Sequence, residues 1–175
     1  MPQTTTAIDA LKVALKIEDE GRVFYRQAAR KSANTLTKRL FTTLAEQELG
    51  HKKAFQKAYD KMCAGETCPV LTLPRGEALK ARAVFTDAMK EIGAAVTPST
   101  TEQEAINLAK EKEIKSRDFY ASQSKRAADP VEKNFYDVMA GEEQGHYLQL
   151  NDYSEFLINP AGFFVMAERQ SMDGA

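Results

Sequence analysis

The sequence predicts an all-α protein, a four-helix bundle assembled from two repeated helical hairpins. Three observations carry this prediction: four long segments with apolar residues at helical spacing, an internal repeat at an offset of 95 residues, and a Glu-x-x-His motif in each half. The chain has 175 residues, of which 43% are hydrophobic and 28% are charged. This length and composition suit a single domain, 1–175, with a buried core.

Charge and hydropathy exclude several function classes. The formal net charge is −1, so the chain offers no overall basic field for nucleic acid or for an anionic membrane surface. No apolar run approaches the roughly 18 residues that a membrane-spanning helix needs. The N-terminal residues contain no basic segment followed by an apolar core, so we expect no secretory signal and a cytoplasmic location.

The first hairpin is expected over about 4–62. Its first helix begins at a run of threonines whose hydroxyls can cap it, and it carries apolar residues at three- and four-residue steps. A short polar turn at 32–35 leads into a second helix, so the two helices are antiparallel neighbours. Glu18 in the first helix, and Glu48 and His51 in the second, fall on the apolar stripes that face the core.

A long crossover is expected over 63–100. Glycines and prolines interrupt helix formation there, with room for one short extra helix at about 77–92. A segment of this length can run along the bundle and place the third helix parallel to the second. Cys63 and Cys68 do not have Cys-x-x-Cys spacing and are interpreted as reduced loop cysteines, with a redox pair as the alternative.

The second hairpin is expected over about 101–158. Its first helix starts at a capping box and again carries a glutamate, Glu113, on the apolar stripe. Asp129 and Pro130 provide an N-cap and a first-turn proline for the fourth helix, which an Asn-Pro pair ends. The tail at 159–175 contains phenylalanines and is expected to pack back on the bundle.

The two halves coincide when the chain is shifted by 95 residues, without a gap from the first helix to the end of the motif. Each half then supplies one lone glutamate and, on the partner helix, a glutamate and a histidine three residues apart. Residues at this spacing share one face of a helix. The paired positions are Glu18 with Glu113, Tyr25 with Tyr120, Glu48 with Glu143, and His51 with His146.

Four carboxylates at one level of a bundle core require a compensating charge, because burying isolated charges is costly even after the protein relaxes. Protonation could supply neutrality, and so could ion pairs with Arg22 and Arg117, which lie one turn beyond the lone glutamates. Two divalent cations, each also bound by one histidine, would balance the four carboxylates directly. The shared symmetry of the six residues favours the metal interpretation, and iron, manganese and zinc all accept such ligands.

The motifs that carry this chemistry are Glu18-x-x-Gly21-x-x-Phe24-Tyr25, Glu48-x-x-His51, Glu113 with Phe119-Tyr120, and Glu143-x-x-His146. With them the sequence resembles the rubrerythrin-type proteins of the ferritin-like di-iron carboxylate superfamily, over residues 4–158. The resemblance implies a ferritin-like four-helix bundle with a long crossover between helices 2 and 3. It also implies two iron ions (Fe2+/Fe3+) as the cofactor.

The resemblance further implies a role for each site residue. Glu18 and Glu113 would be terminal ligands and Glu48 and Glu143 bridging carboxylates, with His51 and His146 as nitrogen ligands, one for each iron. Two tyrosines would donate hydrogen bonds behind these ligands, with plain core packing as the alternative: Tyr25 and Tyr120.

Two departures from the family pattern bear on activity. Rubrerythrins proper carry a second glutamate one turn after the third-helix ligand, and Ser116 occupies that position here, which weakens the case for peroxidase chemistry. They also carry a C-terminal rubredoxin domain, whereas this sequence has no cysteine beyond Cys68. Electrons would therefore come from an external donor such as rubredoxin or its reductase.

The leading hypothesis is a di-iron oxidoreductase that reduces hydrogen peroxide or dioxygen in defence against oxidative stress. One alternative is a ferroxidase or iron-handling protein with the same ligands. Another is a non-catalytic helical bundle whose inward glutamates are ion-paired or protonated. The expected unit is a homodimer, and the long crossover allows hairpins to be exchanged between subunits.

Overall fold

The computed structural model describes residues 3–67, 69, 100–160 and 162–163 of the chain. Its long helices are α1 (Gln3–Lys31), α2 (Thr35–Cys63), α4 (Thr100–Arg126) and α5 (Pro130–Ile158). Over the described residues all regular secondary structure is helical and no strand occurs. The prediction of an all-α four-helix bundle is confirmed.

Each hairpin turns on a short polar connection that ends in a capping residue. The side chain of Asn34 accepts hydrogen bonds from two backbone N–H groups in the first turn of α2. Asp129 does the same for α5, with Pro130 in the first turn, as the sequence predicted. The backbone N–H of Asn34 also donates to the Glu102 carboxylate of α4 at 3.0 Å, which joins the first turn to the second hairpin.

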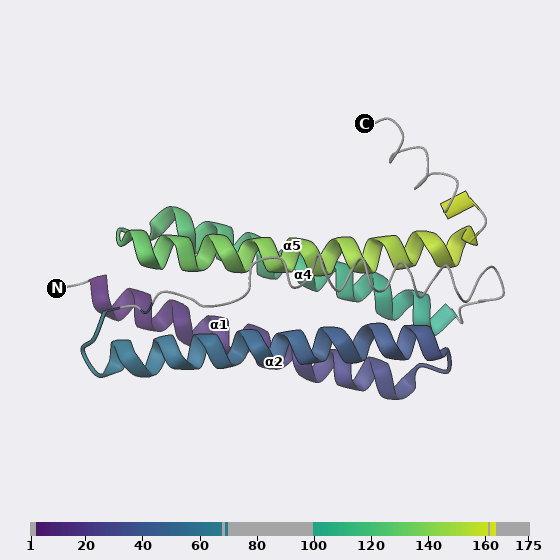
Figure 1. The fold of residues 1–175 in the computed structure, drawn as a ribbon, viewed down its shortest axis with the longest axis horizontal. Coiled ribbons are helices and arrows are strands. Elements are labelled where there is room, and N and C mark those ends of the chain that lie inside the picture. The colour runs from purple at the N-terminus through teal and green to yellow at the C-terminus, as the bar shows by residue number, and fades with distance from the viewer. Residues whose placement is uncertain (1–2, 68, 70–99, 161, 164–175) are drawn as a thin grey trace.

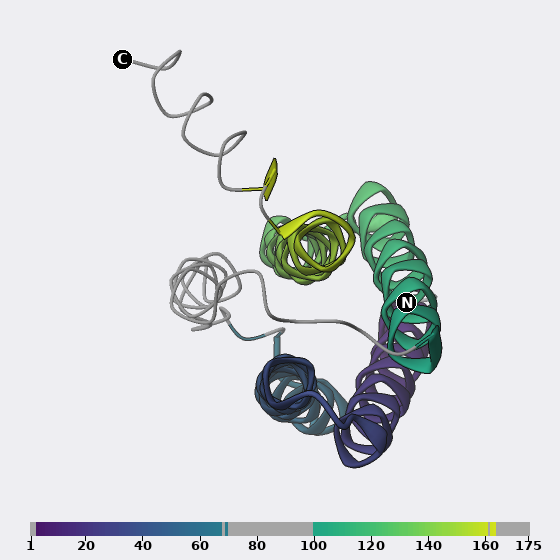
Figure 2. The ribbon, with the colours of Figure 1, turned by 90° about the vertical axis from the view of Figure 1, so that its right-hand side faces the viewer.

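The helices pack as two antiparallel hairpins lying side by side. Figure 1 shows α1 and α5 running in one direction along the bundle and α2 and α4 running in the other. The third long helix is therefore parallel to the second, as the long crossover predicted. Seen along the bundle axis, α4 lies beside α1, while α2 and α5 flank them (Figure 2). The backbones of the two hairpins approach most closely between α1 and α4.

Two hydrophobic clusters fill the described bundle, and a polar level separates them. On each helix the residues of one cluster precede the polar residues and those of the other follow. In α2, for example, Phe41 and Leu44 precede Glu48, and Phe55 follows His51. The polar level is therefore closed at both ends by aromatic and aliphatic side chains that exclude water.

Several predictions concern segments outside the described residues. These are the short helix at 77–92, nearly all of the 63–100 crossover, Cys68, and the 159–175 tail beyond residue 163. Within the described part, Cys63 is exposed at the end of α2 and Phe163 packs against a hydrophobic cluster. No described helix combines the length and the apolar composition needed to cross a bilayer.

Candidate metal centre

Helical periodicity brings the six predicted ligand residues to one level of the core, where each is at most 3% exposed. α1 and α4 contribute one glutamate each. α2 and α5 contribute a glutamate and a histidine that share the inward face because they are three residues apart. The structure thus brings together Glu18, Glu48, His51, Glu113, Glu143 and His146.

The ligand atoms of these residues form two overlapping groups of four, and within each group they lie within 4.8 Å of one another. The Nδ1 atom of His51 is 3.2 Å from a carboxylate oxygen of Glu18, and the equivalent distance from His146 to Glu113 is 3.3 Å. Such an arrangement can hold two metal ions that share two carboxylates. The first group is Glu18, Glu48, His51 and Glu143, and the second is Glu48, Glu113, Glu143 and His146.

Two tyrosines connect the hairpins behind these carboxylates. The hydroxyl of Tyr25 in α1 donates to Oε1 of Glu113 in α4. The hydroxyl of Tyr120 in α4 donates to Oε1 of Glu18 in α1. Burial, together with the nearby carboxylates, raises the pKa of both tyrosines well above the ordinary value, so both hydroxyls remain protonated donors.

The pairing of each tyrosine was not evident from the sequence. Tyr25 lies two turns beyond Glu18 on the same helix, and the repeat places Tyr120 in the same way beyond Glu113. In the structure each tyrosine instead contacts the lone glutamate of the other hairpin, because α1 and α4 lie side by side and run in opposite directions.

The ionisable groups of the cluster differ in their affinity for protons. Burial and the neighbouring carboxylates raise the pKa of Glu48 and Glu143 well above the usual range. Burial opposes ionisation of Glu18 and Glu113 as well, but polar contacts and the charge of the adjacent histidines hold the pKa of both below its usual value. Burial also opposes the charge on His51, yet the adjacent carboxylates raise its pKa to about 9.

Hydrogen bonding does not satisfy this cluster. Buried atoms without a hydrogen-bond partner in the described chain include Oε2 of Glu18, Oε2 of Glu113, Oε1 of Glu143, Nδ1 of His51, and both ring nitrogens of His146. The close contacts between histidine and carboxylate atoms thus lack hydrogen-bond geometry. Unpaired buried polar atoms are rare because each one forfeits its hydration. Four carboxylates and two imidazoles are a donor set that fits two divalent transition-metal ions.

Arginine does not compensate the buried carboxylates. The guanidinium of Arg117 donates to Gln144 and Asp118, both outside the cluster. In the described part of the chain, the ion-pair contacts of Glu18 and Glu113 are with histidines alone. The alternative in which Arg22 and Arg117 neutralise the core is therefore wrong for this structure.

The fold and the cluster together define a ferritin-like carboxylate bundle with room for two metal ions. The family model described as Rubrerythrin matches residues 9–153, so the chain belongs to the rubrerythrin family. A comparison with curated protein sequences finds no match. Among solved structures, a hypothetical protein from Pyrococcus furiosus is similar, with 22% identity, coverage of 87% of this chain and 90% of that chain, and a TM-score of 0.63. At this identity the likeness supports the fold alone.

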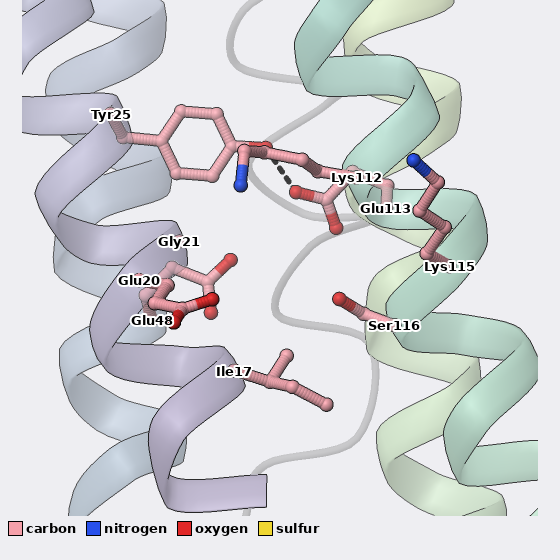
Figure 3. Close-up of a pocket in the computed structure, with 9 residues that line it drawn as sticks. All are labelled: Ile17, Glu20, Gly21, Tyr25, Glu48, Lys112, Glu113, Lys115 and Ser116. Atoms are coloured by element: carbon pink, nitrogen blue, oxygen red, sulfur yellow. Dashed lines mark hydrogen bonds between the residues drawn. The ribbon is translucent and has the colours of Figure 1, made fainter. Parts of the chain in front are cut away.

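A pocket of about 180 Å³ lies between α1 and α4 and is lined by Glu48 and Glu113 (Figure 3). Gly21 and Ser116, which are equivalent in the repeat, both line it and leave space beside the carboxylates. A Cβ atom on Gly21 would lie only 3.3 Å from the carboxylate carbon of Glu48. Gly21 belongs to the sequence motif, but no role could be assigned to it from the sequence alone. The one indication that it lies near the site was its alignment in the repeat with Ser116. The other lining residues are Ile17, Glu20, Tyr25, Lys112 and Lys115.

We expect Gly21→Ala to disturb metal binding while the chain stays folded. Alanine favours a helix by about 1 kcal/mol over glycine, but its methyl group would press on the Glu48 carboxylate. Cobalt(II) titration should show binding weakened by about tenfold. Gly141→Ala is the matched control, because a Cβ atom there meets nothing within 4 Å. Equal cobalt affinity in the two variants would show that the contact leaves the carboxylate in place.

The metal-free chain should lose stability as the pH rises. The pKa of His51 is 6.5 in the unfolded chain and about 9 in the folded one, so its contribution is complete below pH 6.5 and lost as the pH passes through about 9. The raised pKa of Glu48 and Glu143 acts in the same direction, because their neutral forms favour the folded state. Urea midpoints of chelator-treated protein should fall across this range, and midpoints that rise with pH would contradict the expectation.

Proposed function

We propose that the six-residue cluster holds two iron ions and that the chain is a rubrerythrin-type oxidoreductase, which reduces hydrogen peroxide or dioxygen with electrons from an external donor. The observation that carries the proposal is the pair of overlapping ligand groups, in which several buried carboxylate and imidazole atoms lack a hydrogen-bond partner in the described chain. Two ferrous ions together would supply the two electrons that reduction of peroxide consumes.

In this proposal the lone glutamates and the histidines each serve one ion, and the two paired glutamates serve both. The tyrosine hydroxyls occupy Oε1 of Glu18 and Glu113, which leaves Oε2 of each glutamate facing a histidine. This division fixes the orientation of each carboxylate before a metal arrives. The hydrophobic clusters on both sides keep bulk water from the site.

The pocket between α1 and α4 is the proposed entrance for the oxidant. It is the side on which Glu48 and Glu113 border a space of about 180 Å³, enough for peroxide or dioxygen. Ser116 lines this space with a neutral hydroxyl, so the chain would work with six ligand residues and without a carboxylate at position 116. Lys112 and Lys115 also line the pocket and would offset the negative charge within.

Glu48→Ala should remove metal and leave the helices in place. Glu48 belongs to both ligand groups, so its loss weakens both positions, while one fewer buried carboxylate relieves repulsion in the core. His146→Ala should weaken the second position alone. Elemental analysis after reconstitution should give about two metals per chain for wild type and fewer than about one for Glu48→Ala, with helical circular dichroism retained.

The control for this experiment is Glu111→Ala, which removes an exposed carboxylate of α4 that belongs neither to the ligand groups nor to the lining of the pocket. It changes the net charge as Glu48→Ala does but leaves the cluster intact, so its metal content should equal that of wild type. Full metal content in Glu48→Ala would contradict the ligand assignment.

Reduced, iron-loaded protein should be oxidised by stoichiometric hydrogen peroxide, and faster than by dioxygen. Two ferrous ions match the two-electron demand of peroxide, and the buried site has a side entrance large enough for it. Stopped-flow absorbance in the near ultraviolet would follow the reaction, with Glu48→Ala as the inactive reference. Absence of a spectral change on adding peroxide would contradict the proposal. Faster oxidation by dioxygen, with release of ferric iron, would favour the ferroxidase alternative.

A further inference from the structure

A basic groove of about 290 Å³ lies on the first hairpin, between α1 and α2. Three arginines from α1 and one lysine from α2 line it: Arg22, Arg26, Arg30 and Lys38. The same lining includes three apolar residues and one acidic residue: Ala29, Ala45, Leu49 and Glu46. We use the name basic groove for this set of residues.

The basic groove keeps an excess of positive charge, because its lining has three arginines and a lysine but one acidic residue, Glu46. Arg22, Arg26 and Arg30 follow one another at four-residue steps along one face of α1, a spacing at which like charges repel. None of these arginines, nor Lys38, is in the ion pairs that the described residues form on the surface. Asp19, three residues before Arg22, pairs with Lys52 and has a weaker electrostatic interaction with Arg22. The fold therefore retains a row of cations in which positive charge exceeds the negative charge nearby.

The second hairpin provides an internal comparison. Asp118 and Asp137 pair with cations on the second hairpin. Their counterparts in the first hairpin are Val23 and Thr42, so the first hairpin lacks these two acids. At these two positions the second hairpin therefore pairs its cations with acids that the first hairpin lacks, whereas the first hairpin has Glu46, whose counterpart is Gly141. On the second hairpin, the counterparts of Arg22 and Lys38 are ion-paired at 2.8 Å: Arg117 with Asp118, and Lys133 with Asp137.

The composition of the chain points to an occupant from another molecule. The segment 70–99 contains four basic and three acidic residues, and the segment 164–175 contains one basic and two acidic residues. Neither segment has the acidic excess that three arginines and a lysine would require. The arginine row also extends about 12 Å along α1, which suits several carboxylates on a protein surface better than one compact anion.

The basic groove lies directly behind the candidate metal centre. Leu49, which lines the groove, follows Glu48 in the chain, and Arg22 is one turn beyond Glu18. We infer that the groove docks an acidic, one-electron donor protein, an inference that rests on the proposed function. Two reduced donors, docking in turn and each losing one electron, would return two ferric ions to the ferrous state. The donor would approach from the α1/α2 side, away from the oxidant pocket between α1 and α4.

Charge reversal tests the docking site on the full, iron-loaded chain. Arg30→Glu and Lys125→Glu form a matched pair, since both residues are exposed, lie in the last turn of their helices and are equivalent in the repeat. The probe is a reduced rubredoxin with an acidic surface, mixed with ferric protein in a stopped-flow instrument. At low salt, Arg26→Glu/Arg30→Glu should slow reduction by at least about tenfold, Arg30→Glu by less, and Lys125→Glu should stay within about twofold of wild type.

Binding is measured separately from electron transfer, by calorimetric titration with zinc-substituted rubredoxin. The double variant should bind it at least about tenfold more weakly than wild type, and added salt should weaken binding to wild type most. Equal effects in Arg30→Glu and Lys125→Glu, or unchanged binding in the double variant, would overturn the docking site. Tighter binding of a DNA fragment than of rubredoxin at the same salt would overturn the assignment to an acidic protein.

Two further measurements distinguish a failure of this inference from a failure of the proposed function. Metal content and reduction by dithionite, a small reductant, should be the same in all variants, which shows that the metal site is intact. Oxidation by peroxide is measured on the same samples. Loss of rubredoxin binding in the double variant, without any peroxide reaction in wild type, would support the docking site and contradict only the proposed function.

Discussion

Repulsion among four buried carboxylates is the constraint on which the rest of this structure depends. Side chains that are almost fully enclosed cannot all carry charge unless something compensates them. Protons can meet this constraint in part, because Glu48 and Glu143 have raised pKa values and His51 remains charged to a higher pH than usual. Two divalent ions would meet it with fixed positive charge, and the unpaired ligand atoms are already gathered where such ions would bind.

The same constraint explains why the interior is symmetric while the surface is not. Inside, each hairpin must deliver the same ligands at the same level, and each tyrosine must reach the glutamate of the other hairpin. Outside, no such requirement acts, and the two hairpins differ in charge. Lys133 pairs with Asp137, whereas Lys38 lies in the basic groove, where cations outnumber acids. A symmetric site can thus have an oxidant approach on one side and a reductant on another, because each approach is set by surface residues.

The helices, the caps at Asp129 and Pro130, and the inward position of the ligand residues could be predicted from the sequence, because each depends on local spacing along one helix. The repeat then predicted that the two halves supply matching ligand residues to one site, although it did not show how the halves pack. What could not be predicted depends on how α1 and α4 lie against each other. The crossed contacts of Tyr25 and Tyr120, and the closeness of Gly21 to the Glu48 carboxylate, arise only from that arrangement. Helical periodicity carries no information about it.

The crossed tyrosine–glutamate contacts have a consequence for what one hairpin is in chemical terms. Each hairpin holds a donor that it does not use itself and an acceptor that it cannot satisfy, and the other hairpin supplies the opposite member of each pair. A single hairpin is therefore a self-complementary half-molecule, whose natural complement is a close copy of itself. When the two copies are joined in one chain, their association no longer depends on protein concentration. Each copy can then acquire different surface residues while the residues of the shared interior stay the same.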